Sequence, residues 1–231
     1  MMLKLSRLNT YYDQAHILRN MSLKVEAGEV VALLGRNGAG KSTTMKAIIG
    51  TVPATSGTIK YCGHDLRKLE NYEAVRLGIG YVPEDRRIFR KLTVLENLIT
   101  GQKPPRAGQE PWTIKRVYEL FPKLEEIKAR LGEQLSGGEQ QMLTVGRTLM
   151  TNPSCLLLDE PTEGLAPVLV QQVTAAIQHL KRRGLAVLMS EQNRNTAASL
   201  ADRVYVLEKG KIIYEGKVKD MPATAQKALG W

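Results

Sequence analysis

A glycine-rich segment between a short apolar run and an amphipathic stretch constrains this chain more than any other feature. Residues 35–43 read GRNGAGKST and match the pattern G-x-x-x-x-G-K-[ST] in full. They follow the continuous apolar run Val30–Leu34, which is typical of a strand buried on both faces of a parallel sheet. Met45, Ile48 and Ile49 then recur at helical spacing. The sequence therefore predicts a strand, a phosphate-binding loop and a helix in succession.

Each part of this loop has a physical role in holding phosphate. Glycines let successive backbone N–H groups turn inward, and the start of the following helix adds positive potential. We expect Lys41 to reach the β- and γ-phosphates and the Ser42 hydroxyl to bind Mg²⁺. The expected nucleotide contacts within the loop are Gly35, Arg36, Asn37, Gly38, Ala39, Gly40, Lys41, Ser42 and Thr43.

Two carboxylates follow a second apolar run. Residues 155–160 read CLLLDE, a buried strand that ends in Asp159 and Glu160. In an open parallel sheet this end of a strand faces the ligand crevice. We therefore expect Asp159 to help hold Mg²⁺ and Glu160 to polarise the water that attacks the terminal phosphate.

A second glycine motif, LSGGEQQ, occupies residues 135–141. Ser136, Gly137 and Gly138 precede a helical pattern and could present hydroxyl and backbone donors at a helix start. From the residues alone this predicts an anion-binding turn with no partner nearby in the sequence.

Composition limits the class of protein. The 231 residues are 43 % hydrophobic and 24 % charged, which fits a folded globular chain and excludes a disordered one. No apolar run approaches the 18 residues of a membrane span, and the N-terminal residues lack a secretory signal, so we expect a cytosolic location. The net charge of +10 permits nucleic acid, an anionic membrane surface or small anions as partners. Cys62 and Cys155 are expected to be reduced thiols without a role.

Strand and helix patterns alternate along much of the chain. β structure is expected over the first thirty residues, at 79–82 and 155–158, at 185–189, and in a hairpin over 204–207 and 211–214. Helices are expected at 94–100, 114–131, 168–181, 196–201 and 223–229. The chain therefore reads as an α/β protein with a mostly helical middle third.

The three motifs, in this order, resemble the nucleotide-binding subunit of ATP-binding-cassette (ABC) transporters. LSGGEQQ matches the motif that defines that superfamily, and the resemblance covers essentially the whole chain. It implies a P-loop NTPase fold with a RecA-like, mostly parallel sheet, an N-terminal antiparallel β-subdomain and a helical subdomain that bears the signature motif. It also implies a single domain over 1–231, divided into an antiparallel part at 1–29, a core at 30–86 and 152–231, and a helical part at 87–151.

The same resemblance implies an ATPase that works in pairs. Two cassettes close head to tail, so that Ser136, Gly137, Gly138 and Glu139 of one meet the γ-phosphate held by Lys41 of the other. Hydrolysis at Glu160 then separates them. Tyr12 falls where an aromatic ring stacks on adenine, and its alternative is a surface tyrosine beside Tyr11.

Three positions depart from the general pattern of the superfamily. Glu84 replaces the usual glutamine after Tyr-Val-Pro, and a carboxylate there can still bind Mg²⁺ or its waters. Gln192 replaces the usual histidine, so that it can donate a hydrogen bond but cannot become cationic. Ala166 replaces the aspartate that usually follows Leu165. These changes put in doubt any communication between sites that depends on histidine or aspartate.

The tracts GIGYVPEDRRIF, LTVLENL, GLAP and SEQN together resemble one subfamily, the smaller ATPase subunit of importers for branched-chain amino acids, with relatives that serve urea and short amides. This resemblance implies a second ATPase subunit, a larger sister or a second copy, together with integral-membrane permeases and, indirectly, a solute-binding protein. It places the chain peripherally at the cytoplasmic face of the plasma (inner) membrane, with no nucleic-acid partner. Arg86, Arg87, Ile88 and Phe89 are candidate permease contacts.

Two other classes remain as alternatives. A soluble ABC-type ATPase that acts on nucleic acid or ribosomes fits the positive charge, but residues 44–134 show no sustained heptads and only one set of motifs is present. A P-loop kinase or GTPase explains Lys41 and Asp159 but leaves LSGGEQQ without a role.

Overall fold

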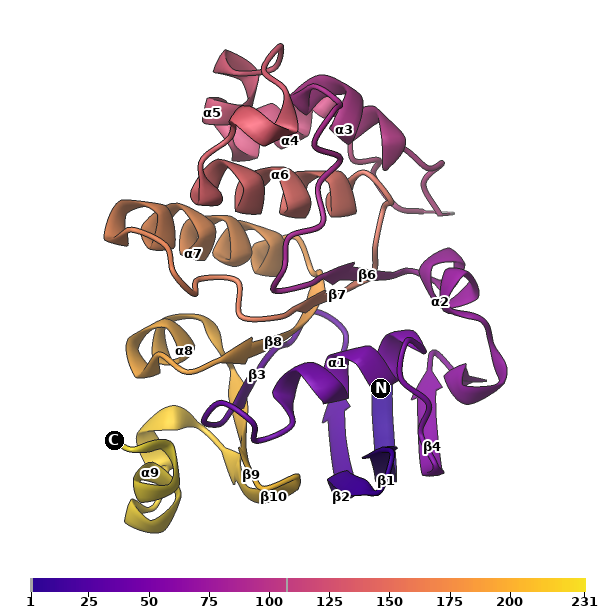
Figure 1. The fold of residues 1–231 in the computed structure, drawn as a ribbon, viewed down its shortest axis with the longest axis vertical. Helices are drawn as coiled ribbons and strands as arrows, with labels where there is room; N and C mark the ends of the chain where they lie inside the picture. The colour runs from indigo at the N-terminus through magenta and orange to yellow at the C-terminus, as the bar shows by residue number, and fades with distance from the viewer. Residues whose placement is uncertain (1, 107) are drawn as a thin grey trace.

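The computed structural model describes residues 2–106 and 108–231 (Figure 1). Within them it contains one mostly parallel and one antiparallel β-sheet. In the described residues the larger sheet has the strand order β10-β9-β3-β8-β7-β6, and its pairs are parallel apart from the β9–β10 hairpin. Its strands are β3 (Val30–Leu34), β6 (Ile79–Val82), β7 (Cys155–Leu158), β8 (Ala186–Glu191), β9 (Arg203–Glu208) and β10 (Lys211–Gly216).

The continuous apolar runs in this sheet contribute side chains to two hydrophobic cores. Val30, Ala32 and Leu34 lie in the core beneath the helices, whereas Val31 and Leu33 lie in the core that faces the second sheet. A strand sends successive side chains to opposite faces, so a strand buried on both sides needs apolar residues at every position. All five residues of β3 are buried, as the sequence predicts.

The second sheet is antiparallel and has the order β2-β1-β4-β5. It consists of β1 (Leu3–Tyr12), β2 (Ala15–Val25), β4 (Ser56–Tyr61) and β5 (His64–Asp65). Its inward residues share one core with Met45 and Ile48 of helix α1 (Lys41–Ile49). The limit of 1–29 for the antiparallel part was therefore too narrow, because β4 pairs along β1.

Of the other helices, α2 (Asn71–Leu77) packs beside α1 in the core shared with the second sheet, whereas the rest cover the opposite face of the larger sheet or form a separate layer at one end of the molecule (Figure 1). The rest are α3 (Val94–Thr100), α4 (Ile114–Leu120), α5 (Pro122–Glu126), α6 (Gly137–Leu149), α7 (Pro167–Arg182), α8 (Arg194–Leu200) and α9 (Ala223–Leu229). The layer at the end contains α3 to α6. Among residues 2–106 and 108–231, none of the helices has both the length and the apolar character that crossing a bilayer requires.

The prediction of a single helix at 114–131 was wrong. Phe121 ends α4 and also precedes α5, with φ −132° and ψ 76°, and Pro122 is the first residue of α5. Proline cannot donate to the preceding turn and disfavours helical geometry in the residue before it, so the helix breaks there. The helices at 94–100 and 223–229 are confirmed, whereas α2 and β4 were not predicted.

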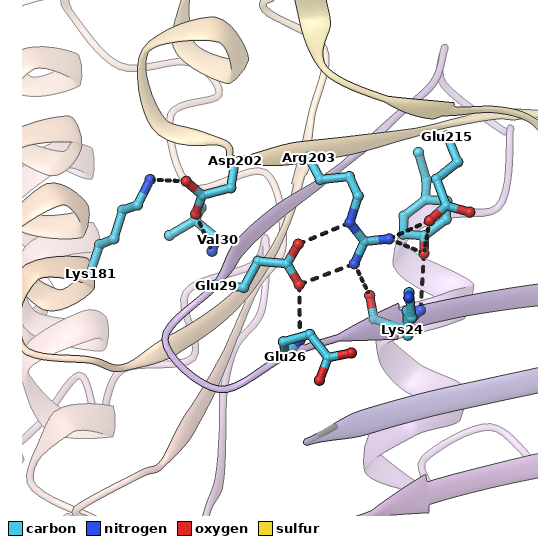
Figure 2. A network of polar contacts seen from close by, with 9 residues as sticks. Lys24, Glu26, Glu29, Val30, Lys181, Asp202, Arg203 and Glu215 are labelled. Carbon is cyan, nitrogen blue, oxygen red and sulfur yellow. Dashed lines mark hydrogen bonds and ion pairs between the residues drawn. The ribbon is translucent and has the colours of Figure 1, made fainter.

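A polar network ties the strands together at the end of the sheet opposite the glycine-rich loop (Figure 2). The guanidinium of Arg203, at the start of β9, donates to both carboxylate oxygens of Glu29 at 2.9 and 3.0 Å. It also donates to the Lys24 carbonyl at 2.9 Å and to Glu215 at 2.5 Å. The network therefore joins β2, the turn before β3, β9 and β10.

Candidate functional site

The loop after β3 is glycine-rich for steric reasons. Gly38 and Gly40 have φ values of 79° and 110°, a region that side chains with a Cβ rarely adopt. A Cβ on Gly40 would lie 2.9 Å from a methyl carbon of Leu18, and one on Gly35 would lie 2.7 Å from the Leu207 carbonyl oxygen. The loop can therefore bend back over the start of α1 only with glycine at these positions.

Lys41, the first residue of α1, lies inside this loop. Its ammonium group donates to the carbonyl of Gly35 at 2.8 Å and to that of Arg36 at 3.3 Å. It also forms an ion pair with Glu160 at 2.9 Å. The side chain is 3 % exposed, so a positive charge is held in place among acceptors at the mouth of the loop.

Asp159 is the centre of a hydrogen-bond cluster at the carboxyl end of β7. Its Oδ1 accepts from the hydroxyls of Ser42 at 3.0 Å and Ser190 at 2.8 Å. Its Oδ2 accepts from the Tyr81 hydroxyl at 3.3 Å. The pKa of Tyr81 is raised mainly by burial and, to a smaller extent, by the charge of Asp159. The phenol therefore stays protonated as a donor. Asp159 and Ser42, predicted to share a metal ion, are thus in contact.

Glu160 adopts a left-handed backbone conformation, with φ 46°. Its backbone N–H donates to Ser190 Oγ at 2.8 Å, and its Oε2 accepts from the Gln192 amide at 2.6 Å. The same amide nitrogen of Gln192 donates to Asn37 in the loop at 2.9 Å. The structure thus brings together Lys41, Glu160, Gln192 and Asn37, which the sequence had placed in one site.

Glu163 is an acidic neighbour that the sequence analysis missed. Burial pulls the pKa of the Glu160 carboxyl upward, but hydrogen bonds from Glu163, Lys41 and Gln192 outweigh it and hold that pKa below its ordinary value. The hydrogen bond to Glu160, with burial, raises the pKa of Glu163 to about 7. When two adjacent carboxyls share a proton, their pKa values move apart in this way. Glu160 is therefore the ionised member of the pair.

A cavity of ≈ 380 Å³ opens over these groups. Tyr12, 43 % exposed, lines it together with Glu84. The predicted site residues around it are Tyr12, Asn37, Gly38, Gly40, Lys41, Ser42, Thr43, Glu84 and Glu160. Glu84 and Asp159 also line a smaller adjoining hollow. The cavity thus combines an aromatic ring, a phosphate-binding loop, hydroxyls and carboxylates.

The oxygen ligands offered by this cavity and the adjoining hollow fit Mg²⁺. Ser42, Asp159 and Glu84 offer hard oxygen ligands, and Mg²⁺ in phosphate sites commonly takes one or two carboxylates along with phosphate oxygens and water. Within residues 2–106 and 108–231 there is no group of three His, Cys, Asp or Glu side chains that could hold a metal ion by themselves.

The LSGGEQQ segment, hereafter the signature segment (residues 135–141), does not line this cavity. Ser136 caps α6, where its hydroxyl accepts from the Glu139 N–H at 3.3 Å and the Glu139 carboxylate accepts from the Ser136 N–H at 2.8 Å. Both residues line a different cavity of ≈ 760 Å³. A Cβ on Gly138 would lie 2.1 Å from a methyl carbon of Leu169, so a side chain there would displace Leu169. Within one chain, therefore, the signature segment is apart from Lys41.

The expected permease contacts separate into two groups. Arg87 and Phe89 are exposed and line a cavity of ≈ 680 Å³ with Tyr72. Arg86 and Ile88 instead face inward: Arg86 turns toward Gly137 at the start of α6, and Ile88 is partly buried against the core.

Ser190, which joins Asp159 and Glu160, was also missed. It is fully buried and donates to Asp159 while accepting from Glu160. The expected strand at 185–189 ended one residue short of it, whereas β8 continues to Glu191. Leu158 pairs with Met189, so the next residues along β7 and β8 are neighbours. A polar residue at the end of an apolar strand was the available signal.

Comparison with known proteins gives a consistent set of similarities. Residues 18–163 match the family model described as ABC transporter. The chain is 45 % identical over 212 residues, 92 % of its length and 91 % of the relative, to the high-affinity branched-chain amino acid transport ATP-binding protein BraG of Pseudomonas aeruginosa. It is 35 % identical over 208 residues, 89 % of its length and 86 % of the relative, to the lipopolysaccharide export system ATP-binding protein LptB of Escherichia coli.

The fold is also similar to a solved one. The dimeric structure of a post-hydrolysis state of the ATP-binding cassette MJ0796, bound to ADP and Pi, has a TM-score of 0.81 and 27 % sequence identity. The match covers 95 % of this chain and 100 % of that one.

Proposed function

The chain belongs to the ABC transporter family of ATP-hydrolysing subunits, and from that membership we propose that it energises the import of branched-chain amino acids. The observation that supports this cargo is the 45 % identity to BraG along nearly the whole of both chains. LptB, the export relative, is less similar at 35 %.

We assign ATP to the cavity above Lys41. The Tyr12 ring stacks on adenine, and the glycine-rich loop and the Lys41 ammonium group hold the phosphates. Because Lys41 contacts Glu160 at 2.9 Å, the terminal phosphate takes the place of that carboxylate on the ammonium group. Glu160 is then free to accept a hydrogen bond from the attacking water.

Glu160 acts as the general base in this proposal. Its pKa, held below the ordinary value, keeps it ionised and able to orient and deprotonate the water. The Gln192 amide, 2.6 Å from Glu160 and 2.9 Å from Asn37, aligns the carboxylate with the loop. Ser42, Asp159 and Glu84 would hold Mg²⁺, which when bound supplies positive charge against the phosphate oxygens.

The signature segment acts on a second cassette. Ser136, Gly137, Gly138 and Glu139 lie apart from the chain's own Lys41 cavity, which fits a role at the γ-phosphate held by a partner. ATP then joins the two faces, and hydrolysis removes the shared phosphate, so that the affinity between cassettes changes with the state of the nucleotide. The second cassette is a larger sister subunit, or a second copy of this chain.

The remaining partners follow from the same assignment. The chain docks on integral-membrane permeases at the cytoplasmic face of the membrane, through the exposed groove that Arg87, Phe89 and Tyr72 line. A solute-binding protein delivers cargo to the permeases on the other side. The single domain over 1–231 is likewise part of this proposal.

An uptake assay tests the cargo. The chain is captured from solubilised membranes, its permeases are identified, and uptake of labelled leucine is measured in cells that carry either the wild type or Glu160→Gln. We expect permeases to be captured with the chain and leucine uptake to be lost in the variant. Leucine uptake equal in the two strains would contradict the cargo, and loss of labelled urea or acetamide uptake instead would identify the amide relatives.

A further inference from the structure

Arg86 contacts the signature segment and is close in sequence to a residue of the nucleotide cavity. It is two residues from Glu84, which lines the cavity above Lys41. Its guanidinium lies against Gly137, where a Cβ would be 2.7 Å from Nη1. Nε is shielded from solvent and has no hydrogen-bond partner among the described residues. The side chain therefore occupies the space that a larger residue at 137 would need.

The backbone around Arg86 is strained and held by α6. Arg86 and Arg87 have φ values of 61° and 42°, conformations that cost free energy in residues with a Cβ. The Arg86 carbonyl accepts from the Thr144 hydroxyl at 2.6 Å, and the Arg87 carbonyl accepts from Arg147 at 2.5 Å. Strain of this kind persists where surrounding contacts impose it, and here both contacts come from the helix that begins at the signature segment.

We propose that Arg86 is a positioning residue for the signature segment, and that it fixes the turn at Gly137 in the shape that meets the partner's phosphate. This inference rests on the proposed function. The strained backbone carries Arg86 inward while Arg87 turns out to pair with exposed Asp85. Arg86 thus supports ATP hydrolysis in the partner's site. Only Arg87 and its exposed neighbours remain available to the permease.

Glycine at 137 and arginine at 86 are two halves of one contact. Adding a methyl group at 137 displaces the guanidinium, whereas truncating Arg86 removes the atom that the methyl group would strike. The effects of Gly137→Ala and Arg86→Ala should therefore be far from additive. If the two substitutions acted only by lowering the stability of the chain, their effects on the rate of hydrolysis would instead be additive.

The test separates the chain's own site from its signature segment. Affinity for a fluorescent ATP analogue with Mg²⁺ is measured on the isolated chain, and kcat and KM are measured with the second cassette present. Arg86→Ala is expected to bind the analogue within about twofold of the wild type but to hydrolyse ATP about 10–100-fold more slowly. Arg90→Ala, which removes an exposed arginine from the same segment, is the matched control and is expected to leave both quantities unchanged.

Hydrogen exchange and the double variant complete the test. Amides 136–139 are expected to exchange faster in Arg86→Ala than in Arg90→Ala, and Arg86→Ala/Gly137→Ala is expected to be no slower than the slower single variant. Hydrolysis by Arg86→Ala within about twofold of the wild type, lost affinity for the analogue, or additive effects would each overturn the proposal. Failure of the wild-type chain to bind the analogue would instead overturn the proposed function.

Discussion

The ammonium group of Lys41 and the carboxylate of Glu160 form an ion pair at 2.9 Å, with both side chains almost wholly shielded from solvent. The two groups that we propose to bind the phosphate and to activate the attacking water therefore neutralise each other. Nucleotide has to separate them, because a terminal phosphate on Lys41 competes with Glu160 for the same positive charge. The proposed function thus links nucleotide binding and activation of the base through one contact.

Glu160→Gln tests that link. The amide cannot accept a proton, so we expect kcat to fall by about 10²–10⁴-fold. Nucleotide affinity is expected to hold or rise, since a neutral amide competes less for Lys41. Phosphate release and equilibrium titration measure the two quantities. Glu133→Gln, a change at an exposed carboxylate paired with Lys91, is the control, and normal turnover in Glu160→Gln would remove the assigned base.

Gln192 aligns Glu160 through a single amide group. Gln192→Ala removes the donor to both Glu160 and Asn37, so we expect kcat to fall about tenfold with little change in nucleotide affinity. Gln192→Glu places a second carboxylate against Glu160 and is expected to be slower still. If kcat in steady-state hydrolysis were the same for Gln192→Ala and the wild type, the amide would have no part in alignment.

The pair Glu160 and Glu163 gives stability a dependence on pH. The pKa of Glu163, about 7, lies above the ordinary carboxyl value of 4.5, so the native chain binds more protons than the unfolded chain between these values. The free energy of unfolding is therefore expected to fall as pH rises from about 4.5 to 7. Glu160 acts in the opposite direction only below its ordinary value, because its pKa is lowered.

Glu163→Gln keeps a donor beside Glu160 but cannot titrate. Urea unfolding at several pH values should then show a flatter profile between about pH 4.5 and 7 than the wild type shows. Identical slopes for the two proteins would mean that Glu163 does not hold the proton.

Arg203 is predicted to be important for stability rather than for chemistry. Arg203→Ala leaves Glu29, whose side chain is 16 % exposed, without its two charge-assisted hydrogen bonds (Figure 2). We expect a loss of about 2–4 kcal/mol in the free energy of unfolding. Lys123→Ala breaks an exposed pair with Glu126 and should cost less than about 0.5 kcal/mol. Equal losses in urea unfolding would contradict the importance of the network.

Sequence reasoning succeeded where a run of residues is compatible with only one kind of local structure. Continuous apolar runs identified β3 and β7, and glycines followed by Lys41 identified the loop. It failed for β4, because pairing with β1 depends on contacts across about fifty residues of chain. It also failed at Pro122, where the helical periodicity on either side concealed a break.

The same limit applied within the candidate site. Asp159, Glu160 and Gln192 were selected by motif, and their contacts agree with a shared site. Ser190 and Glu163 belong to no pattern of that kind, since their positions depend on the register of β7 against β8 and on the turn after Glu160. The turn of Arg86 toward Gly137 depends on two left-handed residues, which composition does not reveal.

The proposed function depends on ATP entering the cavity above Lys41, and equilibrium titration of the purified chain with a fluorescent ATP analogue and Mg²⁺ tests this most directly. The wild type is expected to bind saturably and Lys41→Ala to lose that binding, while Lys60→Ala, a change at an exposed lysine of β4, retains it. Equal affinity in the wild type and Lys41→Ala, or no binding by either, would contradict the account.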